Sequence, residues 1–128
     1  MTVRFLSNGS SRPQTDYVSC TIKTAEQRGN ALLLGFTDGT VIRIQDNGQE
    51  CCENLYMRTD DNLSDLVGHR FVGISVNSIT ETTDIYGNEH EIVFLDVKTD
   101  GGMITFSFHN EHNGHYGGFG LDLDEVSP

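Results

Sequence analysis

The chain has 128 residues, a length that accommodates one compact domain with a single core and leaves no room for a second. Eight basic residues stand against 19 acidic ones, so the formal net charge is −11, which disfavours direct binding to nucleic acids and to anionic membranes. Residues 1–44 carry a net charge of +2 and residues 45–128 a net charge of −13. We therefore expect one strongly negative part of the surface.

The three cysteines cannot all pair within the chain, and the N-terminus lacks the basic and apolar segments of a signal peptide. No apolar stretch approaches the roughly 20 residues that a membrane helix needs. These features predict a soluble protein of a reducing cytoplasm.

Residues 1–16 predict an N-terminal arm or edge strand followed by a turn-rich loop, and residues 17–128 predict a single antiparallel β domain. The β-branched segment 17–22 predicts a strand. Apolar runs at 31–36 and 40–44 predict a hairpin through Asp38-Gly39, because glycine tolerates the positive φ of a tight turn. Residues 46–61 predict a loop with one short strand near 55–58.

One short helix is expected next, beginning at Asp60 or Asp61 and ending at Gly68. Further strands are expected at 71–79, 91–98, 103–108 and 119–124, with a turn at Tyr86-Gly87-Asn88 between the first two. About seven strands joined mostly by short turns predict a mainly β fold, a small antiparallel meander that forms a barrel or a sandwich.

Three histidines are spaced H-x-x-H-x-x-H in the segment HNEHNGHYGGF, at His109, His112 and His115, with Glu111 between them. Imidazole and carboxylate groups can bind transition metals, but a glycine-rich loop does not fix their geometry as a helix does. We favour instead an interpretation in which histidine and asparagine side chains bond backbone groups of a sharp turn at Gly114, Gly117 and Gly118. We accordingly expect no metal and no cofactor.

Cys51 and Cys52 are adjacent, and the sequence has no second cysteine pair to complete a structural zinc site. The acidic neighbours Glu50 and Glu53 disfavour a reactive thiolate, so buried, inert thiols are the preferred interpretation. A cysteine–histidine dyad stays open if the fold brings His112 beside Cys51.

The segments CCENLYMRTDDNLSDLVG, YGNEHEIVFLDVKTDGG and FHNEHNGHYGGF together resemble an uncharacterised domain family of bacteria and their phages. The resemblance covers about residues 38–120 and brings no established activity. It implies a small accessory protein of mobile elements, in which the CCE loop and the HNEHNGHYGG loop lie together. An aromatic residue is usual in the family where this chain has His115.

These observations predict a non-enzymatic binding protein of phage or prophage type that acts in the host bacterial cytoplasm and inhibits a defence system. It would either sequester a nucleotide-like small molecule or bind a host defence protein through its acidic face. Aromatic rings would stack a base and arginines would hold phosphate. The candidate ligand-binding residues are Glu53, Tyr56, Arg58, Arg70, His109, Asn110, His112, Asn113, Tyr116 and Phe119.

Two alternatives stay open. One is a small metal- or thiol-dependent enzyme that uses His112, Glu111 and Cys51; the other is a structural interaction module whose motifs serve to fold its loops. Because a short meander leaves sheet edges exposed, we also expect a homo-oligomer.

Overall fold

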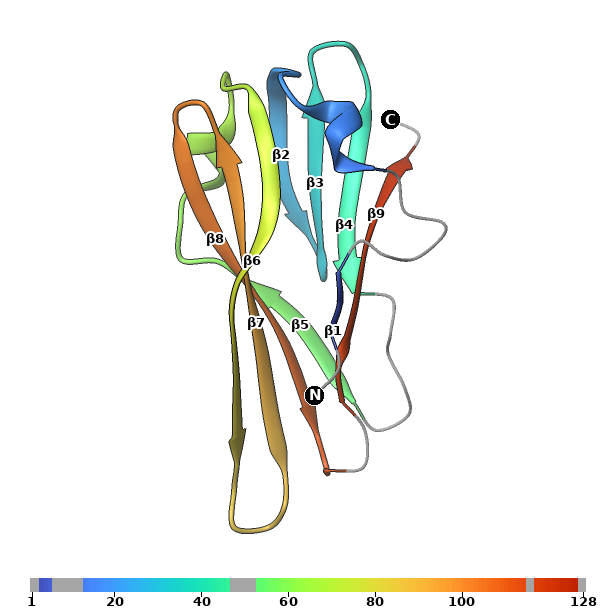
Figure 1. The fold of residues 1–128 in the computed structure, drawn as a ribbon, viewed down its shortest axis with the longest axis vertical. Coiled ribbons are helices and arrows are strands. Elements are labelled where there is room, and N and C mark those ends of the chain that lie inside the picture. Colours follow the sequence, from blue (N-terminus) through green and yellow to red (C-terminus); the bar gives the residue numbers. More distant parts are fainter. Residues whose placement is uncertain (1–2, 6–12, 47–52, 115–116, 127–128) are drawn as a thin grey trace.

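The computed structural model describes residues 3–5, 13–46, 53–114 and 117–126, and it is a sandwich of two β-sheets (Figure 1). The predicted mainly β fold class is confirmed, and the sheets form a sandwich rather than a closed barrel. Among the described residues, no helix has the length and apolar character that crossing a membrane requires.

The first sheet has the strand order β1-β9-β4-β3-β2, and the second has the order β5-β8-β7-β6. The strands of the first sheet are β1 (Val3–Phe5), β9 (Phe119–Val126), β4 (Val41–Asp46), β3 (Ala31–Phe36) and β2 (Ile22–Arg28). Those of the second sheet are β5 (Asn54–Arg58), β8 (Gly102–His112), β7 (Glu89–Thr99) and β6 (Phe71–Thr83).

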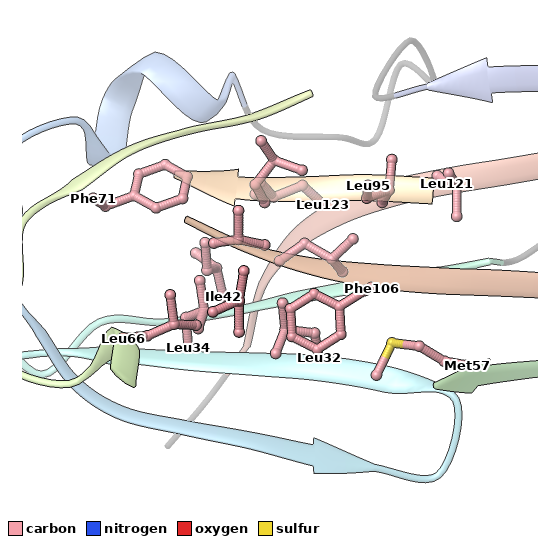
Figure 2. Packing of buried hydrophobic residues seen from close by; sticks show 14 of the residues in the cluster. Leu32, Leu34, Ile42, Met57, Leu66, Phe71, Leu95, Phe106, Leu121 and Leu123 are labelled. Carbon is pink, nitrogen blue, oxygen red and sulfur yellow. The ribbon is translucent and has the colours of Figure 1, made fainter. Parts of the chain in front are cut away.

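Alternation of apolar residues along the strands places one core between the two sheets (Figure 2). Leu34 and Ile42 come from the first sheet, and Leu95 and Phe106 from the second; all four are almost completely buried. Figure 2 also shows Leu66 from the connection between β5 and β6 packed at the same core. Burial of these side chains holds the sheets face to face.

The connectivity is more complex than a meander of consecutive hairpins. Strand β9 pairs with β4, and β8 pairs with β5, so strands far apart in the sequence become neighbours. The edge strand β1 pairs with β9 in parallel, whereas all other strand pairs of the described sheets are antiparallel. The first and the last strand are therefore neighbours in the first sheet.

Two local predictions were wrong. The segment 17–22 is not a strand: a 3-10 turn, η1 (Gln14–Tyr17), ends at Tyr17, and β2 begins only at Ile22. The predicted short helix is present as a single 3-10 turn, η2 (Leu63–Leu66), but its predicted N-cap was wrong, because Asn62 rather than Asp60 or Asp61 caps it. In both cases tertiary packing overrides local propensity.

The predicted Asp38-Gly39 turn is confirmed, with Gly39 at a φ of +92° between β3 and β4. The hairpin of β6 and β7 is longer than expected, since β6 continues to Thr83. Its far end extends beyond the body of the sandwich (Figure 1). The Asp84 carboxylate orders the tip by accepting the backbone N–H groups of Tyr86 and Asn88, at 2.8 and 3.0 Å.

Candidate functional site

The inner face of the second sheet changes from apolar to polar at the end where β8 leads into β9. Phe106 and Phe108 of β8 belong to the core, and the next two residues on the same face are Asn110 and His112. Together with Glu53 and Glu91 they form what we call the buried polar cluster, whose members are all less than a tenth exposed. Buried polar groups require hydrogen-bond partners, so their contacts explain what the cluster does.

Two carboxylates of the cluster hold the turn between β8 and β9. Glu53 Oε2 accepts hydrogen bonds from Asn110 Nδ2 (2.7 Å) and from the backbone N–H of Gly117 (2.8 Å). Glu91 Oε1 accepts the backbone N–H of Gly118 at 2.9 Å, and Asn110 Nδ2 also donates to the Gly118 carbonyl at 3.1 Å. The expected meeting of the two motif segments is thus confirmed for Glu53, and so is the role of Asn110 in bonding backbone groups of the turn.

Hydrogen bonds fix the tautomer of His112. The backbone N–H of Gly114 donates to His112 Nδ1 at 3.0 Å, so that nitrogen carries a lone pair. The proton of the neutral ring is then on Nε2, which donates to Glu91 Oε1 at 2.8 Å. His112 therefore links the turn to the carboxylate, as the interpretation of a backbone-bonding histidine predicts.

Gly117 packs directly against this pair of side chains. A Cβ atom at this position would lie 2.3 Å from Glu91 Oε1 and 2.8 Å from His112 Nε2, and the φ of Gly117 is +130°. Both the close approach and the backbone conformation require glycine.

A third acidic residue, Glu89, borders the cluster from the solvent side. Its Oε2 lies 3.6 Å from His112 Nε2, and its side chain is 34% exposed. Ligand atoms of Glu89, Glu91 and His112 all lie within 4.8 Å of one another, so these three residues could hold a metal ion. Two of the three, Glu89 and His112, line a hollow of about 470 Å³, together with Thr82, Asp84, Asn88, His90, Glu111 and Asn113.

The opposite, outer face of the same sheet carries a second group of polar and aromatic side chains, which we call the outer-face cluster: Tyr56, Arg58, His90, Ser107, His109 and Glu111. The rings of Tyr56 and His109, which are register partners, stack at 4.4 Å with an interplanar angle of 9°. The Arg58 guanidinium lies 5.1 Å from the centre of the Tyr56 ring, within the range of a cation–π contact.

A chain of close contacts runs through the outer-face cluster. His109 Nε2 lies 2.8 Å from Ser107 Oγ, and His109 Nδ1 lies 2.8 Å from His90 Nε2. The Tyr56 hydroxyl lies 3.2 Å from the same His90 nitrogen. Partial burial, and then the neighbouring charges of His90 and Arg58, lower the pKa of His109 below its ordinary value of 6.5. Partial burial and the Glu111 carboxylate raise the pKa of Tyr56.

Beside this cluster is a hollow of about 500 Å³, lined by Arg58, Thr59, Asp60, Asp61, Phe94, Thr105, Ser107 and His109. The hollow thus combines aromatic and apolar surface with one arginine and two aspartates. An aromatic ligand with a limited negative charge would fit this combination better than a polyanion.

Comparison with known families matches residues 16–121 to a family described as a domain of unknown function, DUF7448. The chain belongs to the DUF7448 family. Neither the curated proteins nor the solved structures contain a match to this chain. The matched segment of the DUF7448 domain runs from η1 into β9 and includes every residue of the buried polar cluster and of the outer-face cluster.

The DUF7448 fold divides the predicted site residues among several places. Glu53, Asn110 and His112 lie in the buried polar cluster, Tyr56, Arg58 and His109 lie in the outer-face cluster, and Asn113 lines the hollow beside Glu89. Phe119 is only 4% exposed and belongs to the core, so its ring is not available to a ligand. Arg70 immediately precedes β6, and its backbone N–H donates to Asp100 Oδ1. Tyr116, His115, Cys51 and Cys52 lie outside the described residues.

Of the residues of the enzyme alternative, Glu111 and His112 both line the hollow of about 470 Å³, and Cys51 lies outside the described residues. Glu111 and His112 are successive residues of β8, so their side chains point to opposite faces of the sheet. Glu111 is exposed on the outer face, whereas His112 is buried between the sheets.

Sequence reasoning missed Glu89, Glu91 and His90 as site residues. A signal was present, because Glu91 is in phase with Val93 and Leu95 on the strand predicted at 91–98. That phase places a carboxylate on the buried face of the strand. His90 has the opposite phase, which places it beside His109.

Proposed function

We propose that this DUF7448 protein is a non-enzymatic binding protein that takes a nucleotide-like small molecule on the outer face of its second sheet. The observation that carries this proposal is the stack of Tyr56 on His109 with the Arg58 guanidinium over the tyrosine ring. Planar aromatic groups and a guanidinium on an open sheet face are a common means of holding a nucleobase and an attached anionic group.

The charges around the adjacent hollow limit the net negative charge of the ligand. Arg58 can pair with one anionic group, whereas Asp60 and Asp61 at the same hollow repel further negative charge. The expected ligands are therefore nucleosides or nucleotides with a single phosphate or phosphodiester group, rather than nucleoside triphosphates.

The setting that we propose is a phage or prophage protein in the cytoplasm of a bacterial host. There, a protein that sequesters a nucleotide-like signal would inhibit a defence system that depends on the signal. The resemblance in the CCE and HNEHNG segments supports this setting.

Calorimetric titration with nucleoside monophosphates, cyclic mononucleotides and nucleoside triphosphates tests the proposal. We expect binding of the first or second class, and a loss of affinity of at least about tenfold in Tyr56→Leu and in Arg58→Gln, since one stacked base contributes about 1–3 kcal/mol. Arg28→Gln is the matched control, because Arg28 is an exposed arginine of the other sheet, paired with Glu26. Absence of heat with all three classes, or equal affinities in all variants, would contradict the proposal.

A second candidate function is binding of a host protein through the hairpin of β6 and β7. Ile85 and Tyr86 at its tip are 90% and 84% exposed, and residues 77–91 contain four acidic residues but neither lysine nor arginine. An ordered tip with two bulky apolar side chains suits insertion into an apolar pocket bordered by basic groups.

The two candidates can be separated in a bacterium whose defence the protein relieves. Loss of relief in Tyr56→Leu, but not in Ile85→Ser with Tyr86→Ser, supports the small-molecule proposal, and the reverse pattern supports the protein partner.

A further inference from the structure

We propose that Glu89, Glu91 and His112 form a binding site for one divalent transition-metal ion. None of these three residues belongs to the outer-face cluster, although His90 and Glu111 of that cluster line the adjoining hollow. His112 Nε2 lies 2.8 Å from Glu91 Oε1 and 3.6 Å from Glu89 Oε2. Ligand atoms that each lie about 2.0–2.2 Å from one ion stand about 3–3.6 Å apart, so small side-chain movements would complete the site.

The balance of charge around Glu91 supports a cation independently of these distances. The Glu91 carboxylate is only 2% exposed, and its hydrogen-bond donors are the Gly118 backbone and the neutral His112 ring. Its register partner Asn110 is fully buried, and within the described ranges Asn110 Oδ1 has no hydrogen-bond partner, although Nδ2 has two. A buried carboxylate with only neutral donors among the described residues and an orphaned amide oxygen both cost free energy, and a cation at Glu91 offsets the cost of the carboxylate.

The donor set indicates the class of metal. An imidazole nitrogen with two carboxylates suits zinc, manganese, iron or nickel better than calcium or magnesium, which prefer oxygen ligands throughout. Three protein ligands leave at least one position open toward the hollow of about 470 Å³. The carboxylates of Asp84 and Glu111 line that hollow and raise the local concentration of cations.

Metal binding would change the tautomer of His112. A neutral imidazole that coordinates a metal through Nε2 carries its proton on Nδ1. Metal binding would therefore remove the proton from Nε2, which faces Glu91, and place a proton on Nδ1. The Gly114 N–H could no longer donate to Nδ1, and the turn at Gly114 would have to rotate. Gly114 has a φ of +95°, and glycine allows such a rearrangement at little cost. The ring nitrogens therefore give a spectroscopic signature of binding.

The test uses the full chain without a histidine tag, freed of metal with a chelator and titrated calorimetrically with zinc and with manganese. We expect one ion per chain and at least tenfold weaker binding in His112→Gln and in Glu89→Gln, because even indirect metal contacts change affinity by about 10–100-fold. Glu26→Gln, which removes the same charge from a strand of the first sheet, should leave the affinity unchanged. Nitrogen-15 spectra should show the proton of His112 moving from Nε2 to Nδ1.

Glu89→Gln carries the test even if the loss of the buried His112 unfolds the turn, because Glu89 reaches solvent. Three results would overturn the proposal: no binding of either metal, equal affinity in Glu89→Gln and the wild type, or loss of binding in His90→Gln with Glu89→Gln unaffected. The last result would assign the ion to the histidines of the outer face.

Discussion

Replacing Gly117 with alanine tests whether the buried polar cluster builds the turn between β8 and β9. The new Cβ would lie 2.3 Å from Glu91 Oε1 and 2.8 Å from His112 Nε2, closer than real Cβ atoms approach such groups. Neither neighbour can move freely, because Glu91 also accepts the Gly118 N–H and the His112 ring is held by Gly114. The substitution must therefore displace the turn and break at least one of these hydrogen bonds.

The expected loss of stability follows from two contributions. A non-glycine residue at a φ of +130° costs about 1–3 kcal/mol, and a broken hydrogen bond to a charged group costs about 1.5–3 kcal/mol. The sum, about 2.5–6 kcal/mol, is a large part of the roughly 5–15 kcal/mol that stabilises a domain of this kind. Gly102→Ala is the matched control: its φ is +146°, but a Cβ at this position would meet no atom within 4 Å, so only the backbone contribution applies.

Urea denaturation of both variants and of the wild type measures the difference directly. We expect Gly117→Ala to unfold at a clearly lower urea concentration than Gly102→Ala. If the two alanine variants lose the same free energy of unfolding, the contacts with Glu91 and His112 do not stabilise the turn, and our account of the cluster is refuted.

Acidification should destabilise the fold through His109, because the pKa of this residue is lower in the folded than in the unfolded chain. As the pH drops, the unfolded chain therefore binds a proton before the folded chain does. The free energy of unfolding falls as the pH drops through about 6.5 and stops falling below the folded pKa. Denaturation curves from pH 7.5 to 5 should show a smaller decline in His109→Gln. Glu53→Ala removes the acceptor of one Asn110 side-chain N–H and of the Gly117 backbone N–H, and should lower the free energy of unfolding by about 2–4 kcal/mol, measured with urea. A loss below about 1 kcal/mol would contradict the role of Glu53. The double variant Ile85→Ser, Tyr86→Ser should change the free energy of unfolding by less than about 0.5 kcal/mol, because both side chains are exposed. If the hairpin tip joins copies of the chain into the expected homo-oligomer, the variant should have a lower mass in light scattering. An unchanged oligomer would exclude the tip as its interface.

The outcome for Glu91 and His90 illustrates how far strand periodicity can carry a site prediction. Alternation alone assigns these successive residues to opposite faces of β7, and the structure places them there. Periodicity does not say which strands pair, and it is the pairing of β7 with β8 that brings Glu91 to His112 and His90 to His109. Phe119 shows that residue type alone cannot identify a ligand-binding residue. An aromatic ring that could stack on a base also suits the core, and the burial of Phe119 decides between the two.

The sequence by itself determined the fold class and the chemistry available to the protein. Alternating apolar residues and short glycine turns specify β-strands, and the residues of the CCE and HNEHNG segments supply carboxylates, amides and imidazoles. Only the tertiary structure decided that Glu53 meets the Gly117 turn across 64 residues, and that the site residues separate into a buried and an exposed group. The physical reason is that strand order and register depend on packing the whole core, whereas periodicity is a property of each strand alone.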